Sequence, residues 1–213
     1  MKYIIMCGGE YKEWETPKHL MVVNGEHIVS RTIRLLKEQG ITDIYISSNN
    51  PIFENLGVPV LTHTNNYGKR GGLWCEAFYP LNEPACYLFG DVVFSPEAIK
   101  TIIETETDDI EFFASAPPFR EDYIKKWEEP FAFKVVNQVH LRSAQDLYRV
   151  AYTLGFFKRK KPLAWEFWQI VKKAPLNVKN FTNYTIINDY TCDVDDPADI
   201  DKFNNIVFKN GNR

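Results

Sequence analysis

Residues 2–20 read KYIIMCGGEYKEWETPKHL, and this stretch decides the fold class of the chain. The run at 2–6 is short and apolar and stops at a Gly-Gly pair, which is the pattern of a buried β-strand. Glycines that follow a strand let backbone N–H groups approach an anion closely. We therefore predict that the chain opens with a buried strand whose following turn, at Gly8 and Gly9, can bind an anion.

Strand and helix signals alternate through the first half of the chain. Ser95 and Pro96 are the residue types expected at an N-cap and at the first helical position. Strands that alternate with helices predict an α/β fold with a mainly parallel sheet and helices on both faces. The strands are predicted at 43–47, 58–62, 85–90 and 110–115, and the helices at 28–39, at about 72–81 and from Pro96 onward.

The second half is less regular. Residues 131–136 and 139–141 resemble a β-hairpin or short ribbon around Asn137-Gln138, and Asp196-Pro197 marks the start of a last helix. Two more helices are predicted near 143–154 and 163–173, and a late strand at 185–189. We expect one domain over 1–213, made of a nucleotide-binding half at 1–115, an acceptor half or lid at 116–185, and a return strand and C-terminal helix at 186–213.

Composition excludes several classes of protein. With 213 residues, 45% of them hydrophobic, the chain can bury the core of a single α/β domain. A net charge of −3 argues against a general nucleic-acid binder. The four cysteines form no C-x-x-C pair, and the four histidines have no ligand spacing, which argues against a zinc site. The N-terminal apolar run is too short for a signal peptide or membrane span, so we expect a cytoplasmic protein with no membrane partner.

The polar loop after the first strand delivers a lysine behind a proline. Pro17 fixes its own φ and restricts Thr16, so Lys18 is presented from a stiff segment. A positive charge there can stabilise the charge that develops on a phosphoryl group, which makes Lys18 the candidate catalytic residue. The chain contains no G-x-x-x-x-G-K-[ST] and no G-x-G-x-x-G motif, so ordinary ATPase and dinucleotide-binding hypotheses lack support.

Three aspartates are candidate metal ligands. Asp91 follows the apolar strand 85–90 directly, at the strand end where open α/β sheets bind ligands. Asp193 and Asp195 point to the same side if their segment is extended, and together they would suit a hard cation such as Mg²⁺. A turn-capping role for Asp91 is the alternative.

Two further segments are candidate binding regions. Arg70, Gly71 and Gly72 precede the predicted helix at 72–81, whose N-terminus could bind a phosphate, although a solvated basic turn is an equal alternative. The aromatic and acidic segments 127–131 and 163–168 could line an acceptor pocket, including a cation–π site for a quaternary amine, with core packing as the alternative. The candidate acceptor residues are Glu128, Trp165 and Glu166.

The ordered set of motifs resembles the sugar-phosphate and MobA-like nucleotidyltransferase superfamily, with its glycosyltransferase-A-like Rossmann fold. The resemblance covers roughly 1–100 and 185–205. It implies that the Gly-Gly loop holds a triphosphate, that Lys18 contacts phosphate and that Asp91 binds Mg²⁺. The family also has an aspartate in a D-x-D-x-P-x-D-like motif near the C-terminus. Asp195 matches this aspartate best, and Asp193 is the second candidate. The motifs are Gly8-Gly9, Pro17-Lys18-x-Leu20, Gly90-Asp91-Val92 and Asp193-Val-Asp195-Asp-Pro-Ala-Asp-Ile200.

The phosphate loop departs from the family pattern G-G-x-G-x-R. Tyr11 stands at the third glycine and Glu13 at the arginine, where a carboxylate repels phosphate. Lys12 is the nearest replacement for the missing charge. Gly8, Gly9, Glu10 and Lys12, together with Arg70, Gly71 and Gly72, are therefore the predicted nucleotide-binding residues.

The expected activity is Mg²⁺-dependent transfer of a nucleotidyl group from a nucleoside triphosphate to a phosphorylated small molecule, with release of pyrophosphate. CTP is the favoured nucleotide by similarity to phosphocholine cytidylyltransferases, and synthesis of capsule or cell-surface precursors is the expected role. A homodimer is possible. The alternatives are a non-catalytic nucleotide-binding or regulatory module, motivated by Tyr11 and Glu13, and a glycosyltransferase of the same fold.

Overall fold

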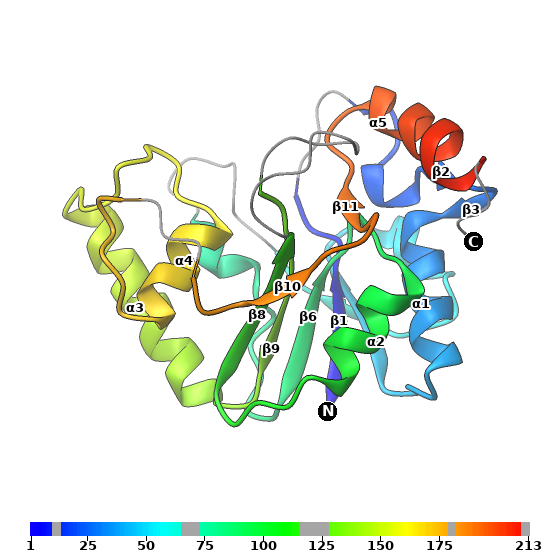
Figure 1. Cartoon of the computed structure of the whole chain (residues 1–213). Coiled ribbons are helices and arrows are strands. Elements are labelled where there is room, and N and C mark those ends of the chain that lie inside the picture. The colour runs from blue at the N-terminus through cyan, green and yellow to red at the C-terminus, as the bar shows by residue number, and fades with distance from the viewer. Residues whose placement is uncertain (10–13, 65–72, 116–127, 179–181, 210–213) are drawn as a thin grey trace.

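The computed structural model describes residues 1–9, 14–64, 73–115, 128–178 and 182–209 (Figure 1). A central sheet with helices packed on its two faces makes up the chain. Among the described residues, no helix combines the length and the apolar character needed to cross a membrane.

Seven strands form the main sheet, and six of them run parallel. β9 alone is antiparallel, between β8 and β6, so the sheet is mainly parallel as predicted. The strand order is β10 (Thr185–Ile187), β8 (Ile110–Ser115), β9 (Pro130–Val135), β6 (Ala85–Phe89), β1 (Lys2–Met6), β4 (Ile44–Ser48) and β5 (Val60–Thr62).

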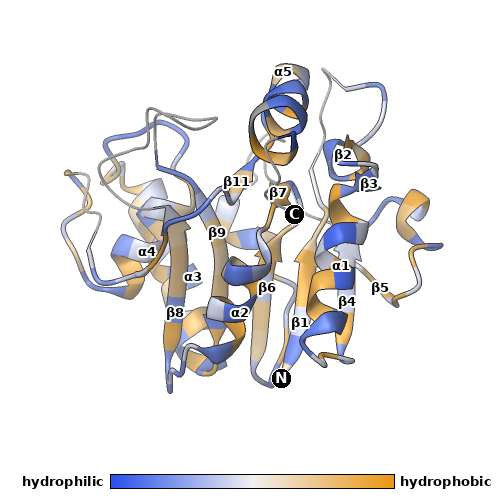
Figure 2. Cartoon of the chain, turned by 45° about the vertical axis from the view of Figure 1, so that its right-hand side comes forward, coloured by the Kyte–Doolittle hydropathy of each residue, from blue (hydrophilic) through white to orange (hydrophobic). Residues whose placement is uncertain are grey.

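Helices cover both faces of this sheet. α1 (Ile28–Glu38) and α2 (Pro96–Glu104) pack on one face, and α3 (Gln138–Thr153) and α4 (Ala164–Val171) pack on the other. Because successive side chains of a strand point to opposite faces, Ile5 joins the core under α1 and α2 while Ile4 joins the core under α3 and α4. Figure 2 shows the apolar strands between these layers.

Two helix starts are confirmed at the predicted caps. The Ser95 hydroxyl accepts a hydrogen bond from the Ala98 N–H at 2.9 Å, directly before α2. Asp196 caps α5 (Pro197–Lys202) in the same way, with its carboxylate accepting from the Ala198 N–H at 2.8 Å. α5 continues into a π-helical segment, Phe203–Phe208.

The predicted ribbon at 131–141 is wrong. Residues 131–135 belong to β9 in the middle of the sheet, with Phe133 opposite both Tyr87 and Phe112. Asn137 does not form a hairpin turn but caps α3, because its side-chain oxygen accepts from the His140 N–H at 3.0 Å. The continuous burial of β9 is that of a central strand, and the described residues that follow it, up to Val171, form the helices α3 and α4 without a ribbon.

The predicted helix at 72–81 is also wrong over its described part. Only a 3₁₀ turn forms, Trp74–Ala77, and the backbone is extended at Phe78. Phe78 is buried in an aromatic cluster, where its ring contacts Tyr87 edge-on at 5.0 Å and Phe133 at 5.4 Å. Aromatic packing against the sheet therefore overrides the helical pattern here.

Candidate active site

The candidate site lies where strands of the main sheet end at one edge. The first strand leads into Gly8 and Gly9, and β6 leads into Gly90 and Asp91. A short antiparallel pair, β7 (Val92–Val93) with β11 (Cys192–Asp193), joins distant parts of the chain at this edge. The Val194 N–H donates to the Asp91 carbonyl at 2.9 Å, so the late aspartates lie beside Asp91.

Lys18 occupies the centre of this arrangement. Its ammonium lies 2.5 Å from the Asp91 Oδ2 and 3.7 Å from the Asp195 Oδ1. Pro17 precedes the 3₁₀ turn Lys18–Leu20, which holds the lysine in a position where only 6% of it is exposed. The structure thus brings together Lys18, Asp91 and Asp195, which the sequence placed at one site.

The Lys18–Asp91 pair controls the charge of the aspartate. Burial, the largest single influence, acts to raise the pKa of the Asp91 carboxyl, but the Lys18 ammonium at hydrogen-bond distance, together with His19 and a backbone hydrogen bond, holds this pKa below its ordinary value. The two residues are therefore a charged pair at neutral pH. A preformed ammonium at the end of the sheet is suited to a phosphate oxygen.

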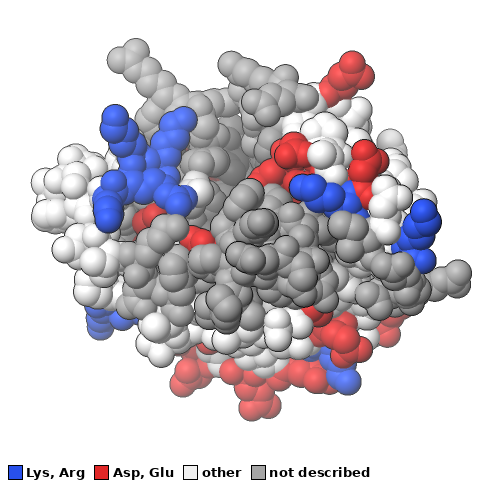
Figure 3. All heavy atoms as spheres, turned by 45° about the horizontal axis from the view of Figure 1, so that its top comes forward, with Lys and Arg blue, Asp and Glu red and all other residues white. Residues whose placement is uncertain are grey.

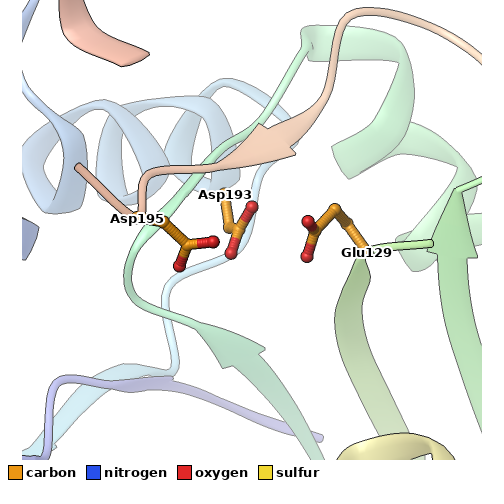
Figure 4. Close-up of side chains that lie close together, drawn as sticks. All are labelled: Glu129, Asp193 and Asp195. Atoms are coloured by element: carbon orange, nitrogen blue, oxygen red, sulfur yellow. The ribbon is translucent and has the colours of Figure 1, made fainter. Parts of the chain in front are cut away.

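Three carboxylates converge next to this pair. Glu129, Asp193 and Asp195 each place one oxygen within 4.8 Å of the others, and Figure 4 shows the three side chains turned toward one another. Oxygen donors of this type are those that Mg²⁺ and similar hard cations bind. Asp193 and Asp195 were predicted for this role, whereas Asp91 is not a member of the group and lies against Lys18 instead.

Glu129 was not among the predicted metal ligands. It precedes β9, and its position is fixed by two hydrogen bonds with Ser115: the Glu129 N–H donates to the Ser115 hydroxyl at 2.9 Å, and the Ser115 N–H donates to the Glu129 carbonyl at 2.9 Å. Because β9 runs antiparallel to its neighbours, its beginning meets their carboxyl ends. Because the sequence pattern predicted a separate ribbon at 131–141, it did not place Glu129 beside the carboxyl ends of the other strands.

Gly90 is required for close packing beneath the site. A Cβ at this position would lie 2.6 Å from the Met6 carbonyl oxygen, 2.8 Å from the Cys7 Sγ and 2.9 Å from the His19 Cδ2. The first of these is backbone that cannot move away by rotating a side chain.

We predict that Gly90→Ala lowers the free energy of unfolding by about 1–3 kcal/mol, the usual cost of overpacking a filled core. Urea unfolding followed by circular dichroism measures this change. A loss below about 0.5 kcal/mol, the range of neutral surface substitutions, would show that the strand ends relax around the methyl group.

His19 is a buried histidine beside the Lys18–Asp91 pair. Only 2% of it is exposed, and its ring meets Phe53 edge-on with 5.8 Å between centroids. Burial is the main reason that the pKa of His19 falls to about 4; Asp91 raises this pKa and Lys18 lowers it. The folded protein therefore holds His19 neutral at pH values where an unfolded chain would protonate it.

We predict that this histidine makes the protein less stable in mild acid. Below about pH 6.5 the unfolded chain binds a proton at His19 that the folded protein does not bind, so the free energy of unfolding falls with pH, by about 2 kcal/mol at about pH 5. Urea unfolding of the wild type and of His19→Gln at about pH 7 and about pH 5 measures this effect. Equal losses in the two proteins would assign the acid sensitivity to other groups.

The predicted acceptor residues lie on the α4 side of the site. Trp165 is buried and meets Tyr184 edge-on at 5.2 Å. The Glu166 carboxylate accepts from the Leu163 N–H at 2.7 Å at the start of α4 and lies 3.5 Å from Arg159, so capping and pairing account for it. Burial is the main cause that raises the pKa of Tyr184, and the charge of Glu128 raises it further.

Part of the predicted phosphate loop lies outside the described residues. Within the described part, Gly9 has a φ of 114°, a conformation that favours glycine, as expected for the turn after the first strand. The predictions for Glu10, Tyr11, Lys12 and Glu13, and those for Arg70, Gly71 and Gly72, fall on residues that the structure does not describe.

Comparison with solved structures identifies the same fold in several nucleotidyltransferases. The inositol-1-phosphate CTP transferase from T. maritima aligns over 96% of each chain with a TM-score of 0.56 and 13% identity. The 4-diphosphocytidyl-2C-methyl-D-erythritol synthase from Anaerococcus prevotii aligns over 95% of each chain, with a TM-score of 0.57 and 12% identity.

A third structure, the CTP:phosphocholine cytidylyltransferase from Streptococcus pneumoniae, aligns over 96% of this chain and 98% of its own, with a TM-score of 0.52 and 18% identity. No curated protein sequence matches the chain significantly. The MobA-like NTP transferase domain matches residues 3–149, more than half of the sequence. The chain therefore belongs to the MobA-like NTP transferase domain family.

Proposed function

We propose that this chain transfers a cytidylyl group from CTP to a phosphorylated small molecule and releases pyrophosphate. The observation that carries the proposal is the position of Lys18 between Asp91 and Asp195, beside a group of three carboxylates, at the carboxyl ends of the strands. In this class of fold, ligands bind at that edge. One part of the site offers a cation to phosphate oxygens, and the adjacent part offers oxygen ligands to a metal ion.

The carboxylate group fits Mg²⁺ by the chemistry of its donors. Glu129, Asp193 and Asp195 would hold the ion, because their oxygens already lie within 4.8 Å of one another. Bound there, Mg²⁺ would neutralise charge on the triphosphate and on the acceptor phosphate. Asp91 holds Lys18 in this arrangement through the 2.5 Å ion pair.

The proposed reaction needs no strong base. An oxygen of the acceptor phosphate forms a bond to the α-phosphorus of CTP, the bond from that phosphorus to the bridging oxygen breaks, and the electron pair leaves with pyrophosphate. A phosphate monoester is already largely deprotonated near neutral pH. Lys18 would offset the negative charge that grows on the α-phosphate, and the Gly8-Gly9 turn would position the triphosphate. The rate enhancement would therefore come from substrate positioning and electrostatic stabilisation.

The acceptor side favours a molecule with a cationic group. The Trp165 ring on α4 meets the Tyr184 ring edge-on, with 5.2 Å between the centroids, and the negative charge of Glu128 helps to raise the pKa of Tyr184. Such surroundings suit a phosphorylated amine, as in a precursor for cell-surface polymers. CTP is the first nucleotide to test, because the three solved structures above are described as cytidylyl enzymes. In this proposal residues 1–115 bind the nucleotide and residues 116–185 bind the acceptor.

Pyrophosphate release tests the proposal directly. The purified chain is incubated with Mg²⁺, with each of the four nucleoside triphosphates, and with phosphocholine, phosphoethanolamine or a sugar 1-phosphate. We expect acceptor-dependent release that is fastest with CTP and a phosphorylated amine. Hydrolysis or transfer of a nucleoside diphosphate sugar would instead indicate a glycosyltransferase, and nucleotide binding without turnover would indicate a regulatory module.

A further inference from the structure

Exposed apolar side chains are concentrated on α3 and the turn that follows it. Eleven large hydrophobic residues are exposed in the part of the chain that the structure describes, and six of them lie between 139 and 156. Single exposed apolar residues are ordinary, but a concentration of them marks a contact surface. The six are Val139, Leu147, Val150, Tyr152, Leu154 and Phe156, with exposed fractions from 43% to 66%.

α3 has a second apolar face that its own fold does not use. Its inner face, with Leu141 and Tyr148, packs into the core against the sheet. The outer face carries Val139, Leu147 and Val150, and Leu154 follows at the C-cap; we name these four residues the outer seam. Their intervals of eight, three and four residues place them along one side of the helix. The three-four spacing from Leu147 to Leu154 is that of helices that pack along their length.

Charges beside the seam are self-complementary. Asp146 and Arg149 lie on one side of the seam, pair with each other at 2.9 Å, and Arg149 also lies 3.9 Å from Glu76. If two copies of α3 lie antiparallel about a twofold axis near Leu147, Asp146 of one copy meets Arg149 of the partner subunit, and the reciprocal pair forms as well. The same register places Val139 opposite Leu154 of the partner subunit. A twofold contact requires a patch that is complementary to itself in this way.

The two ends of α3 differ in charge, which selects the antiparallel direction. Asp109 lies at the N-terminal end, where its carboxylate is 2.7 Å from the His140 Nδ1. The loop that follows the C-terminal end carries an exposed basic run, Lys158–Lys161. Figure 3 shows a group of Lys and Arg side chains at the upper left of the view and several acidic side chains along its lower edge. An antiparallel pair brings the basic end of one copy to the acidic end of the other, whereas a parallel pair joins like charges.

We propose that the chain forms a twofold homodimer through the outer seam of α3. The helix has 16 residues and is therefore about 24 Å long. A contact of this length lies at the small end of specific interfaces, so the dimer dissociates in about the micromolar range. The seam is on the face of the helix turned away from the sheet, so dimerisation leaves the site of each copy complete.

Sedimentation velocity of the full chain at about 1 μM to about 100 μM tests the proposal, because this range brackets a micromolar Kd. We expect the wild type to shift from monomer to dimer across the series. Leu147→Glu places two carboxylates face to face on the twofold axis and should sediment as a monomer throughout. Ile52→Glu is the matched control: Ile52 is 47% exposed but lies outside α3, and this variant should dimerise like the wild type.

A charge exchange distinguishes the seam from a general loss of structure. Asp146→Arg should raise the dimer Kd by about tenfold or more, and adding Arg149→Asp should restore it, because the reciprocal pairs form again with their signs reversed. Circular dichroism and turnover of Leu147→Glu should match the wild type. A wild type that stays monomeric at about 100 μM, or a Leu147→Glu variant that dimerises normally, overturns the proposal.

Discussion

Lys18→Met is expected to lower kcat by at least about a hundredfold, because it removes the ammonium that lies between Asp91 and Asp195. Methionine keeps most of the length of the side chain and removes its charge. The Asp91 carboxylate then loses the neighbour that holds its pKa down, so we also expect a loss of about 3 kcal/mol in the free energy of unfolding. Steady-state kinetics and urea unfolding measure the two effects.

The two effects need to be separated. Lys100→Met removes a lysine from the exposed side of α2 and should change neither quantity. Kinetics measured at low temperature, where the Lys18→Met variant is folded by circular dichroism, isolate the chemical role. If the folded variant retains turnover within tenfold of the wild type, Lys18 is a structural partner of Asp91 and the proposed phosphate contact is wrong.

Local patterns in the sequence were sufficient to predict most of the fold. The first strand, α1 and α2 are confirmed because each is determined by nearby residues: an apolar run before Gly8, a stop at Gly40 and a cap at Ser95. The two wrong predictions concern 72–81 and 131–141, where tertiary packing decides. Phe78 packs in an aromatic cluster, and β9 inserts between β6 and β8, the two strands of the main sheet that directly precede it in the sequence.

The candidate site was also predictable only where local sequence patterns determine it. Lys18, Asp91 and Asp195 were predictable because each follows a strand or a proline that fixes its position, and the structure brings the three together. That Asp91 lies against the lysine while Glu129 joins the other carboxylates was not predictable. It follows from the antiparallel direction of β9 and from its hydrogen bonds with Ser115, which no local pattern encodes.

Replacing Asp193 with Asn should separate metal binding from every other role of the carboxylate group. Two unit charges about 5 Å apart repel by about 3 kcal/mol at an effective dielectric constant of about 20, and a divalent cation turns this repulsion into attraction. Asn keeps the shape of the side chain and removes one charge. We expect the Kd for Mn²⁺ alone, measured by calorimetry, to rise at least about tenfold and kcat to fall at least about a hundredfold.

The change in unfolding temperature caused by Asp193→Asn should have opposite signs with and without Mn²⁺. In a chelator, Asp193→Asn should unfold at the same temperature as the wild type or higher, since like charges within 4.8 Å have been relieved. With Mn²⁺ the order should reverse, because the wild type gains more from the ion. Glu54→Gln, which removes an exposed carboxylate outside this group, should leave both unfolding temperatures unchanged. If Asp193→Asn loses the same stability with and without Mn²⁺ and binds the ion as the wild type does, Asp193 serves the fold alone, and the ion must be held by other ligands.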